Sequence, residues 1–242
     1  MAQEDSFLYA LSSNNAWAGY KAHQNPNFFP KLASGQTPQI LWLGCSDSRC
    51  PETTILGLQP GDVFTHRNVA NIVSPTDINT AAVVEYAVAH LKVRHVVLCG
   101  HTGCGGCIAS LPSDSSNSNN GVGGLLGTWL TPLRALRAAH GEELDGIKDP
   151  SIRAARLAEL NVEAGVRVLM AMGCVQDAVQ EGRLEVHGCL FDIASGRIRD
   201  LGFGTTKGYV RRAVGAGTGG EEVRGRHAQL VFRGGSASMA VR

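Results

Sequence analysis

Three short candidate strands, of which the first and third are apolar runs, constrain the fold of this chain more than any other feature. They cover residues 39–44, 63–66 and 95–100, and the first and third end in glycine. A helical pattern at residues 81–91 separates the second candidate from the third. Short buried strands that alternate with helices are typical of a parallel sheet, so the sequence predicts an α/β fold.

The second half of the chain continues this pattern and then ends the sheet. A stretch rich in Ser, Asn and Gly at 112–124 predicts a loop, and helical patterns follow at 129–140 and 152–179. The segments 184–193 and 197–201 flank a Ser-Gly pair, which indicates a hairpin. We therefore expect a mostly parallel central sheet with an antiparallel edge strand, flanked by helices.

Composition and charge exclude several classes of protein. Hydrophobic residues make up 43% of the 242 residues, enough to form a core, and no apolar run is long enough to span a membrane. The net charge of +1 argues against a nucleic-acid-binding protein. We expect one domain over residues 1–202, which includes an N-terminal helical arm, and a Gly/Arg-rich C-terminal tail over 203–242.

Seven cysteines indicate the compartment and the available chemistry. An odd number in a chain without an export signal disfavours a secreted disulfide framework, so we expect reduced thiols and a cytoplasmic protein. Reduced thiols serve as core side chains, metal ligands or nucleophiles. Five of them receive no role beyond core packing: Cys50, Cys99, Cys107, Cys174 and Cys189.

Two clusters of reactive side chains follow the first and third apolar runs. Cys45, Asp47 and Arg49 follow the first run, and His101 and Cys104 follow the third. Because ligands of parallel sheets bind beyond the carboxyl ends of the strands, we expect these side chains to share one site. Catalytic zinc sites use three protein ligands such as two cysteines and a histidine, and leave a fourth position open. The sequence therefore predicts a metal site.

The residues alone leave other functions open. Cys104 and Cys107 have the spacing of a thioredoxin-like redox pair. A thiol redox protein or a zinc-stabilised binding protein could use these two cysteines. The combination of both clusters favours metal ligation over the redox pair.

The motifs Cys-Ser-Asp-Ser-Arg at 45–49 and His-Thr-Gly-Cys-Gly-Gly at 101–106 resemble those of the plant-type branch of the β-class carbonic anhydrases. The resemblance continues through 61–71, 85–88, 159–162 and a His-Gly pair at 187–188, and it reaches from about residue 4 to 202. It implies a lyase that hydrates CO₂ reversibly to bicarbonate and a proton through a zinc-bound hydroxide.

The resemblance also implies a role for each site residue. The zinc ligands are Cys45, His101 and Cys104, and Asp47 with Arg49 forms the catalytic dyad. Because two thiolates cancel the formal charge of Zn²⁺, we expect Asp47, kept ionised by Arg49, to help hold the hydroxide. Five residues match the substrate pocket of the family: Gln36, Phe64, Val69, Tyr86 and Gly105. Without the resemblance, Phe64 and Val69 would be assigned to core packing.

The resemblance further implies an oligomer. In the family the pocket lies between two subunits, and the loosely helical segment 7–21 would pack against a partner. We expect a homodimer at minimum, with a tetramer as the alternative. The expected small-molecule partners are CO₂ and bicarbonate, and we expect neither a nucleic-acid nor a membrane partner.

A regulatory pocket found in part of the β class is incomplete in this sequence. Trp42 and Arg67 match two members of a Trp-Arg-Tyr pocket where bicarbonate favours a closed site, but Phe191 stands where the tyrosine belongs. One hydrogen bond to a charged group is then missing, and such a bond is worth about 1.5–3 kcal/mol. We therefore expect an open site at neutral to alkaline pH, with Asp47 paired to Arg49, that bicarbonate does not close.

Overall fold

The computed structural model describes residues 5–112 and 122–205, together with two strands near the C-terminus. The chain divides into two compact units, Met1–Val210 and Arg211–Arg242. In the second unit, β6 (Gln229–Arg233) pairs antiparallel with β7 (Ser236–Ala240). All the sites discussed below lie in the first unit.

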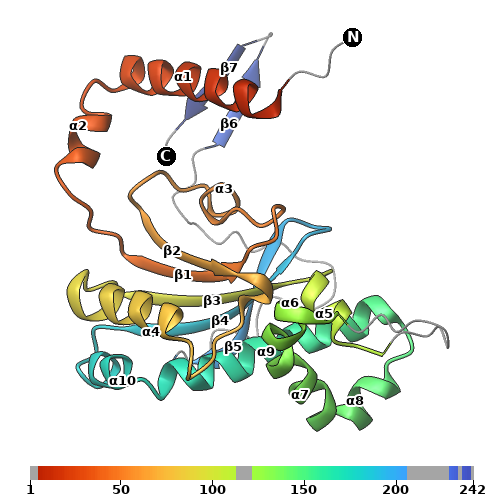
Figure 1. Ribbon diagram of the computed structural model, residues 1–242. Coiled ribbons are helices and arrows are strands. Elements are labelled where there is room, and N and C mark those ends of the chain that lie inside the picture. The colour runs from red at the N-terminus through yellow and green to blue at the C-terminus, as the bar shows by residue number, and fades with distance from the viewer. Residues whose placement is uncertain (1–4, 113–121, 206–228, 234–235, 241–242) are drawn as a thin grey trace, which may run out of the picture. The chain divides into compact units, whose positions relative to one another are not determined.

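A five-stranded sheet forms the centre of the first unit, in the order β2-β1-β3-β4-β5 (Figure 1). The first four strands run parallel, and β5 runs antiparallel to β4. This arrangement confirms the predicted mostly parallel sheet with an antiparallel edge strand. The strands are β1 (Ile40–Cys45), β2 (Val63–Asn68), β3 (His95–His101), β4 (Glu185–Asp192) and β5 (Arg197–Gly204).

Helices and short turns connect and cover these strands. Two of them depart from the α-helix: η1 is a 3₁₀ turn and η2 is a π turn that continues α4. In chain order they are α1 (Ser6–Gln24), α2 (Phe28–Ala33), α3 (Glu52–Leu56), η1 (Val69–Asn71), α4 (Ile78–Glu85), η2 (Tyr86–His90), α5 (Gly105–Ala109), α6 (Gly124–Trp129), α7 (Thr131–Ala139), α8 (Gly141–Gly146), α9 (Pro150–Met170) and α10 (Gly173–Gln180).

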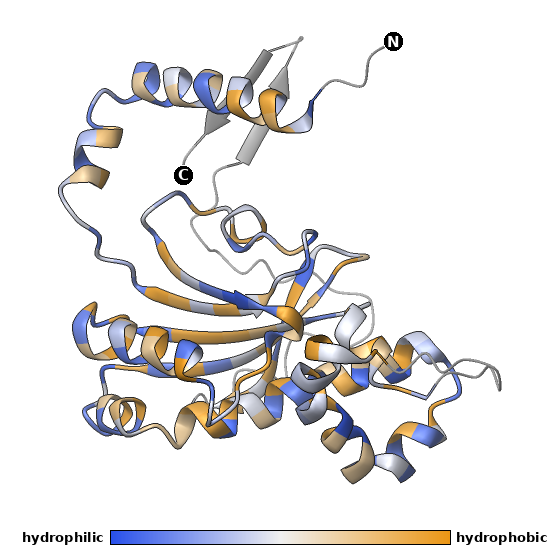
Figure 2. Cartoon of the chain, in the orientation of Figure 1, coloured by the Kyte–Doolittle hydropathy of each residue, from blue (hydrophilic) through white to orange (hydrophobic). Residues whose placement is uncertain are grey.

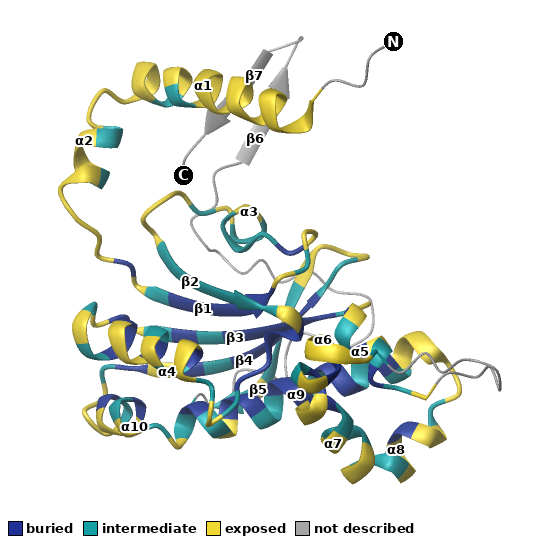
Figure 3. Cartoon of the chain, viewed as in Figure 1, coloured by how far each residue is buried: buried dark blue, intermediate teal, exposed yellow. Residues whose placement is uncertain are grey.

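The two faces of the sheet are covered differently. On one face, α9 and α10 bury Val162 and Val175 in a cluster with Leu98 of β3. Successive strand residues point to opposite faces, so Trp42 and Phe191 lie on the other face, in a cluster against which α3 packs. Figure 3 shows the result: the inner strands β1 and β3 are largely buried, whereas the outer surfaces of the helices are exposed.

The predicted elements differ from the observed ones mainly where a helix is interrupted. The stretch 152–179 forms two helices, because Met172 takes an extended conformation (φ −73°, ψ 129°) and α10 begins at the next residue. Apolar side chains continue at helical spacing across this break, so the pattern did not reveal it. Likewise, the predicted helix 81–91 is α4 followed by the π turn, which buries both Ala87 and Val88. Most of the predicted loop at 112–124 lies outside the described residues.

The first helix, α1, has no buried residue. The carboxylate of Asp5 caps it by accepting the Phe7 N–H at 2.8 Å, and Trp17 meets the Phe29 ring of α2 edge-on at a centroid distance of 5.7 Å. Phe7, which is 69% exposed, is one of several large apolar side chains that α1 leaves in solvent (Figure 2). In the described part of the chain, no helix combines the length and apolarity that a membrane crossing requires.

Candidate metal centre and active site

The carboxyl ends of two neighbouring strands bring two cysteines and a histidine together. Cys45 is the last residue of β1, His101 is the last residue of β3, and Cys104 caps the amino end of α5. One ligand atom from each of the three lies within 4.8 Å of the other two. All three side chains are buried, and the structure therefore assembles the predicted ligand set from segments more than 50 residues apart.

The orientation of His101 leaves one ring nitrogen directed at this set. Its Nδ1 lies 3.0 Å from the carbonyl oxygen of Thr102. A carbonyl oxygen only accepts hydrogen bonds, so Nδ1 carries the proton and Nε2 presents a lone pair. Nε2 is fully buried and has no hydrogen-bond partner. A backbone carbonyl on the far nitrogen is the arrangement by which proteins orient histidine ligands toward a metal.

The two thiols need a cation to ionise. A hydrogen bond with Cys104, followed by burial, raises the pKa of Cys45 to about 12. A hydrogen bond with Cys107 is the largest of the effects that raise the pKa of Cys104 to about 11. Metal ligation requires thiolates and releases their protons. Two thiolates and one neutral imidazole around an enclosed point fit a tetrahedral cation that prefers sulfur and nitrogen ligands and keeps a fourth position open.

Backbone N–H groups support the sulfur of Cys45. Ala70 N–H lies 3.3 Å and Asp47 N–H lies 3.4 Å from Cys45 Sγ. Ala70 is fully buried in the left-handed conformation, at φ +63°. The side-chain amide of Asn161 on α9 donates to the Ala70 carbonyl oxygen at 2.9 Å. Sequence reasoning assigned no role to Ala70 or Asn161, although both lie in segments that carry the family resemblance.

Arg49 holds the Asp47 carboxylate by both oxygens. Arg49 Nε donates to Oδ1 at 2.9 Å and Arg49 Nη2 donates to Oδ2 at 2.7 Å. Arg49 Nη2 also donates to the Gly103 carbonyl oxygen, which ties the dyad to the second cluster. The hydrogen bonds from Arg49 hold the pKa of Asp47 well below its usual range. Asp47 Oδ2 lies 3.9 Å from His101 Nε2, so the carboxylate borders the ligand set while it stays paired with Arg49.

Arg67 fixes the loop that follows β1. Its Nε donates to the Cys45 carbonyl oxygen at 2.8 Å, and its Nη2 donates to the Asp47 carbonyl oxygen at 2.5 Å. Trp42 and Phe191 belong to a buried cluster and are 3% and 5% exposed. Two of the donors of Arg67 are thus used by the protein backbone, and the two aromatic rings serve as core side chains.

The expected pocket residues divide between two places. Val69 lies beside the centre, since it precedes Ala70 and is 41% exposed. Phe64 pairs with Leu41 near the amino ends of β2 and β1. That position is four residues, or about 13 Å, from the strand ends that carry the ligands. The Tyr86 ring packs against Phe64 in a tilted arrangement at a centroid distance of 5.7 Å, so both rings are remote from the ligands of their own chain.

The other two expected pocket residues also lie at different ends of the sheet. Gln36 precedes β1 and lines a cavity of about 290 Å³ together with Phe28 and Gln59. Gly105 is the first residue of α5, next to Cys104, and a Cβ added there would meet open space. At Gly106, by contrast, a Cβ would lie 2.7 Å from the Cβ of Ala70, so this position requires glycine for the close approach of α5 to η1.

Burial disfavours the redox alternative for Cys104 and Cys107. The two residues are 2% and 1% exposed, so neither thiol is accessible to a protein disulfide. Redox-active cysteines are partly exposed and have lowered pKa values, whereas the pKa of Cys104 is raised. None of the seven cysteines forms a disulfide. The pair therefore lacks the properties of a thioredoxin-like site.

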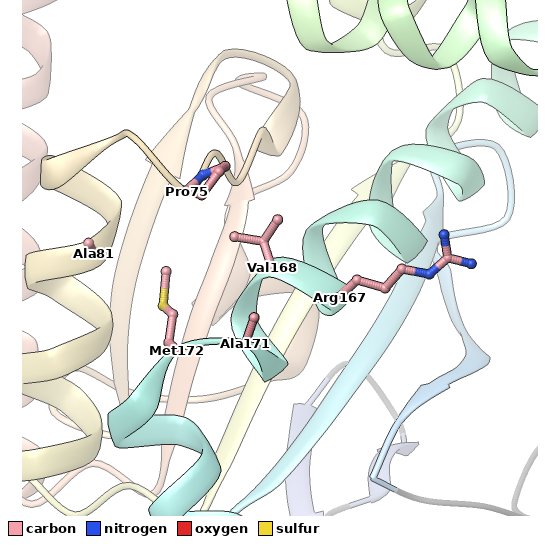
Figure 4. A pocket seen from close by; sticks show the side chains of 6 residues that line it. All are labelled: Pro75, Ala81, Arg167, Val168, Ala171 and Met172. Atoms are coloured by element: carbon pink, nitrogen blue, oxygen red, sulfur yellow. The ribbon is translucent and has the colours of Figure 1, made fainter.

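Of two further cavities, one lies beside the Cys-His-Cys group and the other lies away from it. A cavity of about 900 Å³ adjoins the η1 turn and is lined by Val69, Ile72, Leu126 and Trp129, among others. A cavity of about 440 Å³ lies between the segment before α4 and the end of α9 (Figure 4). In Figure 4 the Arg167 side chain points away from the other lining residues. The remaining lining offers no titratable group: Pro75, Ala81, Val168, Ala171 and Met172.

Comparisons with known proteins agree with this site. A family described as "Carbonic anhydrase" matches residues 40–198. The chain is 44% identical over 192 residues to a carbonic anhydrase of Emericella nidulans, covering 79% of this chain and 81% of that protein. It is 38% identical over 203 residues to a carbonic anhydrase of Candida albicans, covering 83% of this chain and 70% of that protein.

Solved structures show the same relationship. A tetrameric β-carbonic anhydrase of Sordaria macrospora superposes with a TM-score of 0.79 at 65% identity, covering 84% of this chain and 100% of that chain. A Coccomyxa β-carbonic anhydrase in complex with acetazolamide superposes with a TM-score of 0.72 at 34% identity, covering 83% of this chain and 87% of that chain. The sequence and the fold thus lead to one family, and the chain belongs to the β class of the carbonic anhydrases, the enzymes that interconvert CO₂ and bicarbonate.

Proposed function

We propose that Cys45, His101 and Cys104 hold Zn²⁺ and that this centre, assisted by Asp47 and Arg49, hydrates CO₂. The observation that carries the proposal is the buried, unpartnered Nε2 of His101, which faces two buried cysteine sulfurs. When bound, zinc lowers the pKa of a water so that hydroxide is available near neutral pH.

In this proposal Asp47 accepts a hydrogen bond from the attacking water. Its lowered pKa keeps the carboxylate ionised, so it acts as an acceptor throughout the cycle. Two thiolates cancel the formal charge of a divalent cation. A hydrogen-bond acceptor on the protein therefore contributes more to holding the hydroxide than it would in a site with neutral ligands. Arg49 fixes the orientation of Asp47 by its two-point grip and keeps the carboxylate out of the ligand position.

We propose that a second copy of the chain completes the substrate pocket. Val69 offers an apolar surface beside the ligands, but Phe64 and Tyr86 lie about 13 Å along the sheet from them. Tyr86 is 45% exposed, and α1 exposes apolar side chains that a partner could cover. In a two-fold dimer each subunit can offer its Phe64, Tyr86 and Gln36 to the centre of the other. The Sordaria macrospora relative is tetrameric, and a dimer is the minimum that this pocket requires.

The remaining parts of the proposal concern domain limits and location. We assign the catalytic domain to residues 1–202 and give the tail, 203–242, no part in the chemistry. The family match ends at residue 198, and β5 continues the sheet to Gly204, two residues past this boundary. The seven free cysteines support a cytoplasmic location, because cytoplasmic thiols are kept reduced.

Zinc analysis with stopped-flow CO₂ hydration tests the metal assignment. We expect one zinc per chain in the wild type, and we expect Cys45→Ser and Cys104→Ser to lose zinc and activity together, because a hydroxyl does not replace a thiolate. Cys107→Ser is the matched control and should retain both. Full activity after loss of the sulfur of Cys45 or Cys104 would refute the zinc site, and a large loss in Cys107→Ser would support the redox alternative.

A mixing experiment tests the shared pocket. Cys45→Ser subunits lack a centre but keep the pocket residues, whereas Phe64→Ala subunits keep the centre but lack the ring. Co-expression of the two, each inactive alone, yields heterodimers in which one site is intact if the pocket comes from the partner. We expect recovery of about a quarter of the wild-type activity from random pairing of subunits. No recovery would place Phe64 in the site of its own chain.

A further inference from the structure

A second group of metal-ligating side chains lies at the opposite end of the sheet. His95 is the first residue of β3, and Glu185 is the first residue of β4, its partner in the strand register. His187 follows two residues later on β4, so it points to the same face of the sheet as Glu185. His95 is six residues from His101 along β3, which places this group about 20 Å from the Cys-His-Cys centre.

The three side chains converge on one point. His95 Nδ1 and His187 Nε2 are hydrogen-bonded to each other at 3.2 Å, and a bound cation would replace the proton that they share. Glu185 Oε2 lies 3.7 Å from His95 Nδ1 and 3.6 Å from His187 Nε2. These atoms form a triangle with nearly equal sides, and a point close to its plane is about 2.0–2.1 Å from each corner. That distance is the bond length of zinc to imidazole nitrogen and carboxylate oxygen.

The group is accessible to a cation from solvent, and a neutral imidazole is the form in which histidine binds one. The side chain of His95 is 41% exposed and that of Glu185 is 54% exposed, so an ion can enter from solvent without a change in the fold.

We propose that His95, Glu185 and His187 form a second cation site, separate from the catalytic centre, for a divalent transition-metal ion. Two imidazoles with one carboxylate suit Zn²⁺, Ni²⁺ or Cu²⁺ and do not suit Mg²⁺ or Ca²⁺, which take oxygen ligands. Three ligands near one plane leave further positions for water. Bound there, the ion joins the first residues of β3 and β4 and stabilises the pairing of these two strands.

Titration of the untagged holoenzyme tests the proposal. Starting from protein with its single zinc, we expect calorimetry to detect one further equivalent of Zn²⁺ and, separately, of Ni²⁺, with no heat from Mg²⁺. The melting temperature should rise with the concentration of either ion, because the ligand binds the folded state. With Cu²⁺, the electron paramagnetic resonance spectrum should show coupling to two nitrogens.

Three variants and one control locate the site. His95→Gln and His187→Gln should each abolish the second equivalent, and Glu185→Gln should weaken it at least tenfold. His140→Gln is the control, since His140 and Glu143 form a comparable surface pair at 3.4 Å with no third ligand among the residues that the structure describes. CO₂ hydration should be unchanged in all four proteins. If His187→Gln does not fold, the more exposed His95→Gln decides the outcome.

Two results would overturn the proposal. One is the absence of a second equivalent of Zn²⁺ and Ni²⁺ in the wild-type holoenzyme. The other is a second equivalent that persists unchanged in His95→Gln, which would mean that the ion binds elsewhere.

Discussion

Replacement of Asn161 by alanine should weaken both the fold and the metal centre. Asn161 is 4% exposed on α9, and its amide donates to the carbonyl oxygen of Ala70, which is fully buried. Ala70 in turn donates its N–H to Cys45 Sγ. One side-chain amide thus connects α9 to a proposed zinc ligand through a single backbone residue.

The magnitude follows from what Asn161→Ala leaves behind. A buried acceptor that loses its donor costs about 1–3 kcal/mol. Ala70 also occupies a left-handed conformation, and such strain, of order 1–3 kcal/mol for a residue other than glycine, persists only where the surroundings enforce it. We expect a loss of about 2 kcal/mol, which lowers the melting temperature of a chain of this size by about 4–8 °C.

The metal should respond as well as the fold. Outer-shell partners of metal ligands typically contribute 10–100-fold to metal affinity. Asn161 acts only indirectly, through Ala70, so we expect an effect at the lower end of this range. Zinc should be lost to a chelator about tenfold faster than from the wild type. Scanning calorimetry at matched chain concentration, with zinc release followed by a colorimetric chelator, measures both effects.

Two companion variants make the result specific. Glu163→Ala lies on the same helix and removes only a surface pair with Arg167, worth about 0.3–0.5 kcal/mol, so it should behave nearly as wild type. Addition of Ala70→Gly to Asn161→Ala should recover part of the stability, because glycine takes a positive φ without strain. If Asn161→Ala has the same melting temperature as the Glu163→Ala control and keeps its zinc equally well, then other contacts hold η1 in place and the reasoning is wrong.

Three further predictions follow from the same geometry. Asp47→Ala should retain zinc but lose most of the hydration rate, and a folded, metal-free variant would show instead that Asp47 is a ligand. Burial lowers the pKa of His66, so the unfolded chain binds its proton first as pH falls. The free energy of unfolding should therefore decline below about pH 6.5. Melting temperatures measured across this pH range should fall less in His66→Gln than in the wild type. Bicarbonate at mildly alkaline pH should not close the site, because Arg67 already donates to two backbone carbonyls and Trp42 is buried. A crystal structure with bicarbonate between these two side chains would contradict this.

Local patterns in the sequence predicted the sheet and the ligand set. Two apolar runs are followed by reactive side chains, and the carboxyl ends of parallel strands lie at one edge of a sheet. The proximity of Cys45, His101 and Cys104 could therefore be predicted from the sequence. Asp47 and Arg49 are only two residues apart, and such a pair can form with little help from the rest of the chain. In both cases the geometry of the chain over a few residues was sufficient.

Contacts between distant segments were decided only by the tertiary structure. The hydrogen bond from Asn161 to Ala70 joins residues 91 positions apart, and nothing in the local sequence marks a left-handed alanine. The separation of Phe64 from the centre, and the convergence of His95 on Glu185, both depend on strand register. Register is set by which faces the whole sheet buries against its helices. That burial is a property of the packed chain, so no single segment of the sequence contains it.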